Sequence, residues 1–220
     1  MKPAIVYESQ MPADLDQRIR DGLCSCFPAD RAVFSRTRAW HGSAPLYSVV
    51  LLQTPPRPFS LSPLLPFSGE KGDSPHLPER PEGCFAQMGT VPFFPPSRVL
   101  AHAGIVQRTI TAGGCPLRVA GVQNVFVLPE FRRQGLSGRV LQAGMEEAGS
   151  RGFDCGLLFC VPPLETLYAA CGWTALGPRE IVRTEEGRRQ PLPGENVAMF
   201  YPLGVTTFPG GLIDLCGNDW

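Results

Sequence analysis

The chain has 220 residues, a length within the range of one domain that buries a substantial core. Its 20 Lys and Arg residues balance its 20 Asp and Glu residues, which excludes the strong overall field that draws a protein to nucleic acid or an acidic membrane surface. We therefore expect neither a nucleic-acid nor a membrane partner, and any anionic ligand must be bound by local groups.

The N-terminal sequence MKPAIVYESQ has no basic segment followed by an apolar run, and no stretch of eighteen apolar residues occurs. These features predict a soluble, cytoplasmic protein. The eight cysteines form no C-x-x-C pair and no zinc-ligand spacing. Without a secretory signal we expect buried free thiols rather than disulfides, and no metal site.

Strand-like and helix-like segments alternate before residue 53. Apolar residues recur every four positions in DLDQRIRDGLCSCF, which predicts a helix with one buried face. The expected elements are a strand at 4–8, a helix at 14–27, a shorter helix around 30–39 and a buried strand at 46–52.

Residues 53–98 hold eleven of the 24 prolines. Because proline lacks an amide donor and fixes φ, this stretch is neither a central strand nor a long helix. Its apolar residues indicate that part of it packs against something. We interpret it as a Pro-rich loop inserted within a single domain, 1–220. Two roles are open for this loop: it forms a lid or pocket wall, or it is a surface insertion without a functional role.

The second half predicts a hairpin that leads into a strand–helix–strand unit. The expected elements are a strand at 99–114 ending in a Gly-Gly turn, a returning strand at 115–129, a helix at 136–150, an apolar strand at 155–161, a short helix at 163–173 and a strand at 197–203. This order predicts an α/β (α+β) fold with a mixed sheet and helices on both faces.

The turn in PEFRRQGLSGRVLQ (129–142) is the strongest chemical signal. A helix N-terminus carries unpaired N–H groups, so a glycine-rich turn there can hold an anion. Gly135 and Gly138 allow close approach, and Arg132, Arg133 and Arg139 add charge. The pattern matches neither the P-loop nor G-x-G-x-x-G, which argues against a nucleoside triphosphate or a dinucleotide. Taken alone, it also fits an ordinary strand-to-helix turn.

The context of this turn resembles the GNAT superfamily of acyl-CoA N-acyltransferases. The family's V-x-P-E-[YF]-R strand end and [RQ]-x-x-G-x-[GA] turn appear here as VLPEFR (127–132) and RRQGLS (132–137). Ser137 departs from the usual Gly or Ala, and Gly138 follows at once. The second signature, [FL]-Y-x-x-x-G-[FW], appears as LYAACGW (167–173). The resemblance implies a GNAT fold with a mixed, mostly antiparallel central sheet.

The resemblance also implies acetyl-CoA as co-substrate. Turn amides would bind its pyrophosphate and the preceding strand edge would pair with its pantetheine arm. The implied cofactor-binding residues are Val125, Phe126, Val127, Arg132, Arg133, Gln134, Gly135, Leu136, Ser137 and Gly138. Tyr168 falls on the tyrosine that in this superfamily protonates the departing CoA thiolate, and a phenol of pKa ~10 can donate that proton. The alternative is that Tyr168 only packs on the helix's apolar face.

The base that takes the amine's proton stays open. Many GNAT enzymes carry a glutamate on the strand before the turn, where this chain has Gln123 and Asn124. Water, a carboxylate elsewhere, the C-terminal carboxylate and His102 are the alternatives. Gln123 also favours a hypothesis of another class, a GNAT fold that binds acyl-CoA without turnover. Tyr168 and the intact turn favour catalysis.

Two narrower resemblances suggest the acceptor. LYAACGWTALGP and the ending GNDW resemble aminoglycoside 2'-N-acetyltransferases, which implies that Asp219 and Trp220 contact a polycationic sugar, although the order Asn, Asp departs from the family's Asp, Val. RAWHGSAP (38–45) resembles nodulation N-acyltransferases, which would make a longer acyl chain the donor. Both families acylate an amino sugar. We therefore expect a small-molecule amine of that kind as the acceptor, and a homodimer is left open.

Overall fold

The computed structural model describes residues 1–53, 97–192 and 194–220. The helices and strands below all belong to one compact unit, Met1–Gln53 with Arg98–Trp220. Nearly all of the expected Pro-rich loop lies outside the described residues, so its two suggested roles stay predictions.

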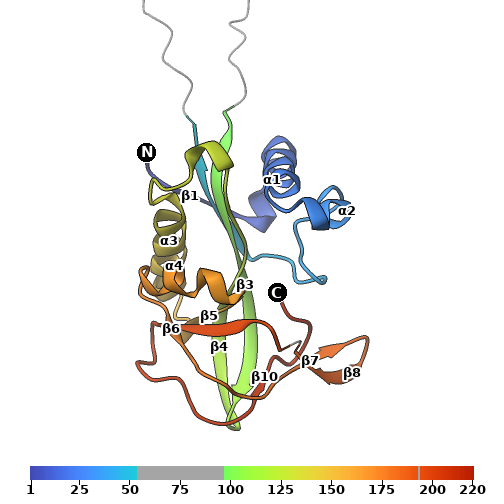
Figure 1. Ribbon diagram of the computed structural model, residues 1–220, viewed down its shortest axis with the longest axis vertical. Coiled ribbons are helices and arrows are strands. Elements are labelled where there is room, and N and C mark those ends of the chain that lie inside the picture. Colours follow the sequence, from blue (N-terminus) through green and yellow to red (C-terminus); the bar gives the residue numbers. More distant parts are fainter. Residues whose placement is uncertain (54–96, 193) are drawn as a thin grey trace, which may run out of the picture. The chain divides into compact units, whose positions relative to one another are not determined.

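In the described ranges ten strands form one sheet, in the order β6-β9-β5-β4-β3, with β2 and β10 both pairing with β3 (Figure 1). Among the described strands, β4–β5 and β10–β7 are parallel and every other pair is antiparallel. The mixed, mostly antiparallel sheet is therefore confirmed. The strands are β1 Ala4–Tyr7, β2 Tyr47–Leu52, β3 Val99–Ala112, β4 Cys115–Val127, β5 Cys155–Cys160, β6 Thr174–Ala175, β7 Ile181–Glu185, β8 Arg188–Pro191, β9 Val197–Pro202 and β10 Ile213–Asp214.

Helices cover both faces of the sheet, as expected (Figure 1). They are α1 Ala13–Cys26, α2 Arg31–Phe34, α3 Leu136–Ser150 and α4 Glu165–Ala169, with short 3-10 turns at Glu8–Gln10, Pro28–Asp30, Pro129–Phe131 and Pro162–Leu164. Two helices are shorter than predicted. α4 ends before Gly172, which adopts a φ of 88°. The chain leaves α2 before Arg38, whose side chain is drawn into the interior by two carboxylates.

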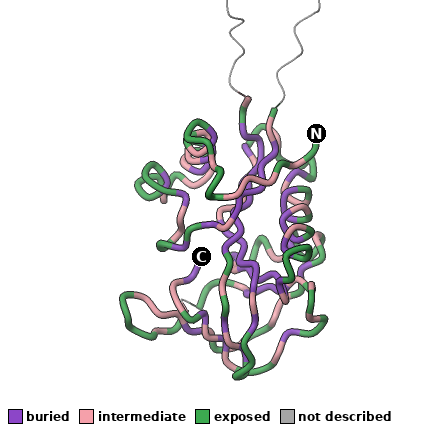
Figure 2. Tube along the Cα trace, turned by 180° about the vertical axis from the view of Figure 1, so that it is seen from behind, coloured by how far each residue is buried: buried purple, intermediate pink, exposed green. Residues whose placement is uncertain are grey.

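The two faces of the sheet bury separate clusters, which Figure 2 shows as buried residues along the central strands. On one face α3 packs through Val140 and Met145 against Val49 of β2. On the other face α1 packs through Ile19 and Leu23 against Val50. This alternation along β2 is the period of two that a strand imposes on its side chains.

A third cluster lies where the C-terminal segment packs against the sheet. Phe208, Leu215 and Trp220 pack there with Val119 of β4 and Leu157 of β5. Sequence patterns did not predict β6, β7, β8 or β10, which are short or carry many charged residues. The C-terminal segment therefore covers sheet surface beyond the reach of α1.

Gly22 in α1 offers a test of this packing. Replacing glycine by alanine inside a helix usually stabilises by about 1 kcal/mol. At Gly22, however, the new methyl group would overlap the ring of Phe126. We expect Gly22→Ala to lower the free energy of unfolding by about 2 kcal/mol, the cost of overpacking.

The matched control is Gly149→Ala in α3, where the nearest atom, Leu203 Cδ2, would lie at an ordinary 3.6 Å. This variant should gain up to about 1 kcal/mol. Urea unfolding measures both variants, and equal effects would contradict the packing of α1 on β4.

Candidate active site

The candidate site lies where β4 and β5 separate. The two strands pair from Val119 to Val122 on β4 and from Cys155 to Leu158 on β5, and β4 then continues to Val127 without a strand partner on that edge in the described chain. The β3–β4 register shifts at the same place, and Asn124 there has a φ of 54°. This irregularity is a β-bulge, which bends a strand and disrupts its ladder.

The larger of two adjoining cavities, about 660 Å³, follows the end of β4, the turn after it and the start of α3. Eight of the ten predicted cofactor residues line it: Val125, Phe126, Val127, Arg132, Arg133, Gly135, Leu136 and Ser137. Gln134 lies exposed in the turn and Gly138 lies in the first turn of α3; neither is among the lining residues. Most of the residues predicted for one ligand thus lie around one cavity.

The turn has a backbone geometry that suits the binding of an anion in this cavity. Arg133 and Gly135 both have left-handed backbones, with φ values of 61° and 69°. Alternation of left-handed and other residues directs successive N–H groups into a concave surface that suits an anion. No side chain of the described residues caps the N-terminus of α3 at Gly135, so the first N–H groups of this helix are left for another acceptor. The local charge comes from exposed Arg132 and Arg133.

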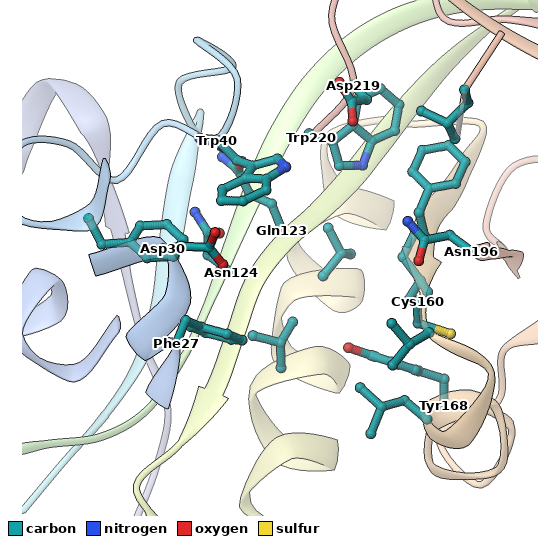
Figure 3. A pocket seen from close by; sticks show the side chains of 18 residues that line it. Phe27, Asp30, Trp40, Gln123, Asn124, Cys160, Tyr168, Asn196, Asp219 and Trp220 are labelled. Atoms are coloured by element: carbon teal, nitrogen blue, oxygen red, sulfur yellow. Dashed lines mark hydrogen bonds between the residues drawn. The ribbon is translucent and has the colours of Figure 1, made fainter. Parts of the chain in front are cut away.

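The smaller cavity, about 330 Å³, lies between two groups of aromatic side chains (Figure 3). Phe27, Phe34 and Trp40 lie on one side, with Phe34 and Trp40 stacked at 5.5 Å. Phe159 and Trp220 lie on the other, with ring centroids 5.6 Å apart. The polar lining side chains are Asp30, Gln123, Asn124, Cys160, Tyr168, Asn196 and Asp219.

The two cavities share the lining residues Phe27, Val125, Leu164 and Tyr168. The Tyr168 hydroxyl points into the gap between the separated strands (Figure 3). Burial raises the pKa of Tyr168, and Cys160 and Cys171 nearby raise it further, so the phenol stays protonated near neutral pH. Burial raises the pKa of Cys160 to about 11, so this thiol also stays protonated. Neither group is a proton acceptor at neutral pH.

Asp219 and Trp220, the predicted substrate residues, both line the smaller cavity. Each also has protein partners. Asp219 Oδ1 lies 2.8 Å from His41 Nδ1 and 2.7 Å from Arg183 Nη1. The Trp220 indole N–H donates to the Leu157 carbonyl at 3.4 Å. These contacts fix the C-terminal segment beside the cavity.

His102 lines neither cavity. It is 1% exposed, its Nδ1–H donates to the Asn124 carbonyl at 2.9 Å, and its Nε2 accepts from Ser48 Oγ at 3.1 Å. Burial lowers its pKa to about 4. The ring therefore supports the bulge and is not placed to deprotonate an amine. Gln123 is fixed too, since its amide donates to the Ser43 carbonyl at 2.8 Å.

Sequence patterns missed several residues of the smaller cavity, above all Asp30. Its carboxylate faces the cavity (Figure 3) and makes no hydrogen bond or ion pair within the part of the chain that the structure describes. The sequence analysis included Asp30 only as the expected first residue of a short helix. Trp40 lies in the RAWHGSAP stretch, whose resemblance pointed to a longer acyl donor and not to this cavity, and Asn196 belongs to a loop without a local pattern.

The seven described cysteines are free, with Cys155 and Cys160 buried and Cys115 and Cys216 exposed. The expectation of buried thiols thus holds for some of them and is wrong for others. In the described ranges no cluster of three or more His, Cys, Asp or Glu side chains could hold a metal ion. None of the helices seen there is long and apolar enough to cross a membrane.

Comparison with known proteins identifies the architecture. The acetyltransferase (GNAT) domain model matches residues 87–176. The structure is similar to that of the GNAT family N-acetyltransferase YhbS from Escherichia coli in complex with CoA (TM-score 0.57, 14% identity, 98% of this chain and 91% of that one). It is also similar to Escherichia coli ElaA (TM-score 0.51, 11% identity, 91% of this chain and 98% of that one). The fold is the GNAT fold. Comparison with curated protein sequences found no match.

Within this GNAT fold the buried His102 makes stability depend on pH. An unfolded histidine has a pKa of about 6.5, and the folded value of about 4 lies below it. Between these values the unfolded chain binds the extra proton, so stability is lost as the pH falls through that window. From pH 7.5 to pH 5 the loss from this residue should be about 2 kcal/mol.

Urea unfolding at the two pH values measures this loss. His102→Gln removes the titrating group, so the variant should lose about 2 kcal/mol less than the wild type over the same interval, whatever its stability at pH 7.5. An equal loss of unfolding free energy in the two proteins between pH 7.5 and pH 5 would contradict a neutral, buried His102.

Proposed function

We propose that the protein is an acetyl-CoA-dependent N-acetyltransferase that transfers an acetyl group to a primary amine of an amino sugar or aminoglycoside-like compound. One observation carries the proposal: two adjoining cavities, suited to ligands of opposite charge, share Tyr168 as a lining residue. Such an arrangement suits direct attack in a ternary complex, in which both substrates are bound before the chemical step.

The larger cavity supports the donor assignment. A pyrophosphate fits the amides around Arg133 and Gly135, where a helix N-terminus and exposed arginines favour an anion. Among the described strands none pairs with the β4 edge at Val125 and Val127, so this edge can pair with an extended, amide-containing arm such as pantetheine. The thioester then lies near Tyr168, where the cavities adjoin.

The smaller cavity supports a cationic acceptor. Its lining side chains include the carboxylates of Asp30 and Asp219, and no Lys or Arg occurs among its described lining residues. Aromatic faces attract an ammonium group and also pack against the apolar face of a sugar ring. Asp30 is half-buried and its carboxylate has no partner among the described residues, so an amine held near it would gain a charged hydrogen-bond acceptor.

The proposed step balances protons as follows. The neutral amine attacks the thioester carbonyl carbon, a C–N bond forms, and the C–S bond breaks as the tetrahedral intermediate collapses. The Tyr168 phenol donates its proton to the departing thiolate, while the new amide nitrogen loses one proton to solvent. Tyr168 then regains a proton from solvent. Its raised pKa keeps it in the donating form.

Binding of acetyl-CoA is the first test. Gly135→Asp and Gly135→Asn add side chains of nearly equal size at a left-handed position that both residues tolerate. Apart from the adjacent residues of the chain, no described atom would lie within 4 Å of the added Cβ. Only aspartate places a negative charge beside the pyrophosphate. In a thermal-shift titration, acetyl-CoA at a hundred times its Kd should stabilise the wild type by about 2.7 kcal/mol.

The asparagine variant should keep most of this stabilisation and the aspartate variant should lose it. Longer acyl-CoAs, titrated in parallel, show whether the donor is longer than acetyl. If no acyl-CoA stabilises the wild type, the donor assignment is wrong.

Turnover is the second test. Tyr168→Phe should lower kcat by about 10²–10⁴, the contribution of a general acid, and leave stabilisation by acetyl-CoA unchanged. Release of the CoA thiol with D-glucosamine, neamine and spermidine as acceptors measures kcat. The control is Tyr201→Phe, which removes a hydroxyl from a tyrosine that packs on Trp173 and lines neither site cavity.

Equal rates for Tyr168→Phe and the wild type would remove the general-acid role. A wild type that binds acetyl-CoA and acetylates no amine would favour the non-catalytic acyl-CoA-binding module.

A further inference from the structure

The segment Trp40–Ser43, part of the RAWHGSAP stretch, forms a tight turn. The Ser43 N–H donates to the Trp40 carbonyl at 2.7 Å. His41 and Gly42 between them have left-handed backbones, with φ values of 42° and 77°. The β-carbon that a side chain would add at Gly42 lies 3.7 Å from the Asn218 amide. The turn therefore lies directly against the C-terminal segment.

Three hydrogen bonds join this turn to residues 218–219. His41 Nδ1 lies 2.8 Å from Asp219 Oδ1. Ser43 Oγ donates to the Asp219 carbonyl at 2.9 Å, and the Asn218 amide donates to the His41 carbonyl at 2.7 Å. Backbone and side-chain groups of both segments take part, which is the pattern of a specific docking contact rather than a chance surface pair.

The turn is itself fixed to the sheet. The Gln123 amide of β4 donates to the Ser43 carbonyl at 2.8 Å, and Arg108 Nη2 of β3 donates to Ser43 Oγ at 3.0 Å. From the other side, Arg183 of β7 donates to Asp219 Oδ1 at 2.7 Å. Asp219 is thus held between the turn and β7. Asp219 Oδ1 accepts hydrogen bonds from both His41 and Arg183.

The contact also sets the position of Trp220. The Trp220 indole lies over Gly121, where the methyl group of an alanine would overlap the ring. Trp40, at the start of the turn, lines the opposite aromatic wall of the smaller cavity (Figure 3). One set of hydrogen bonds therefore ties the wall that contains Trp40 to the wall that contains Trp220.

We propose that the turn Trp40–Ser43 is the docking site for Gly217–Trp220 and that His41 is a positioning residue for acceptor binding. His41 is not among the lining residues of the smaller cavity, so it acts through lining residues that it contacts: Asp219, by the hydrogen bond, and Trp40, on which its ring stacks at 4.6 Å. The inference rests on the proposed function where it concerns the acceptor. The docking contact itself does not depend on which reaction is catalysed.

Two substitutions at His41 separate positioning from chemistry. In His41→Asn the amide nitrogen can replace Nδ1 as the donor to Asp219, and asparagine tolerates the left-handed backbone. His41→Leu is of similar bulk and has no donor. If the ring nitrogen Nε2 instead acted as a base, both variants would lose it equally.

The experiment measures docking and turnover in the full chain. Fluorine NMR of protein labelled with 5-fluorotryptophan reports Trp40, Trp173 and Trp220, assigned by single Trp→Phe variants. Steady-state assays use whichever of D-glucosamine, neamine and spermidine the wild type acetylates fastest. We expect His41→Leu to shift the Trp220 resonance and raise KM for the amine about tenfold or more, as loss of a hydrogen bond to a charged group predicts. Its kcat and acetyl-CoA binding should stay within about twofold, and His41→Asn should match the wild type in both measurements.

Each outcome decides the matter. A Trp220 resonance that is unmoved in His41→Leu overturns the docking contact. A kcat that falls equally in both variants overturns positioning and assigns the ring a chemical role. If acetyl-CoA binds but no amine is acetylated, the proposed function fails and the role in acceptor binding fails with it. The Trp220 resonance still tests the docking contact in that case.

Discussion

The separation of β4 from β5 after Val122 and Leu158 is the constraint on which the site depends. A continuous parallel pair would close both cavities with a hydrogen-bonded ladder. The separation begins at the bulge, where Asn124 adopts a left-handed backbone. Two contacts hold that backbone: the Asn124 amide donates to the Arg38 carbonyl at 2.7 Å, and His102 donates to the Asn124 carbonyl at 2.9 Å. Buried polar groups therefore stabilise the backbone at the point where β4 separates from β5.

Those groups form a connected network around the buried side chain of Arg38. Its guanidinium contacts Glu8 at 2.8 Å, Asp16 at 2.5 Å and Ser48 Oγ at 2.9 Å, and Ser48 donates in turn to His102. Burial alone would raise the pKa of Asp16, but hydrogen bonds from Arg38 and Arg20 and their charges lower it overall. A buried charge that lost one partner would cost several kcal/mol, so the network has to be kept whole. The bulge is thus stabilised by residues that do not line the cavities.

Local sequence patterns predicted the parts of the site that lie on one continuous segment. The turn at 132–138 was predicted because its glycines and arginines lie between an apolar run and an amphipathic helix, and Tyr168 was predicted because LYAACGW resembles the second GNAT signature. The central strands were predicted because their apolar residues form clear runs. The wall with Asp30 and Trp40 was not found, because it is assembled from a 3-10 turn and a loop that meet only through tertiary contacts. The hairpin β7–β8 was missed for a related reason: Arg188–Pro191 is polar and pairs with only one neighbour.

The residues shared by both cavities, Phe27, Val125, Leu164 and Tyr168, have a consequence for inhibitor design. Under the proposed function, a single molecule that joins a pantetheine thiol to an amine through a short spacer would occupy both cavities, because the two cavities adjoin at these residues. Linking the two parts turns the second binding event into an intramolecular one, so affinity rises without any new contact. The spacer length that binds best would then report how far apart the protein holds its two substrates.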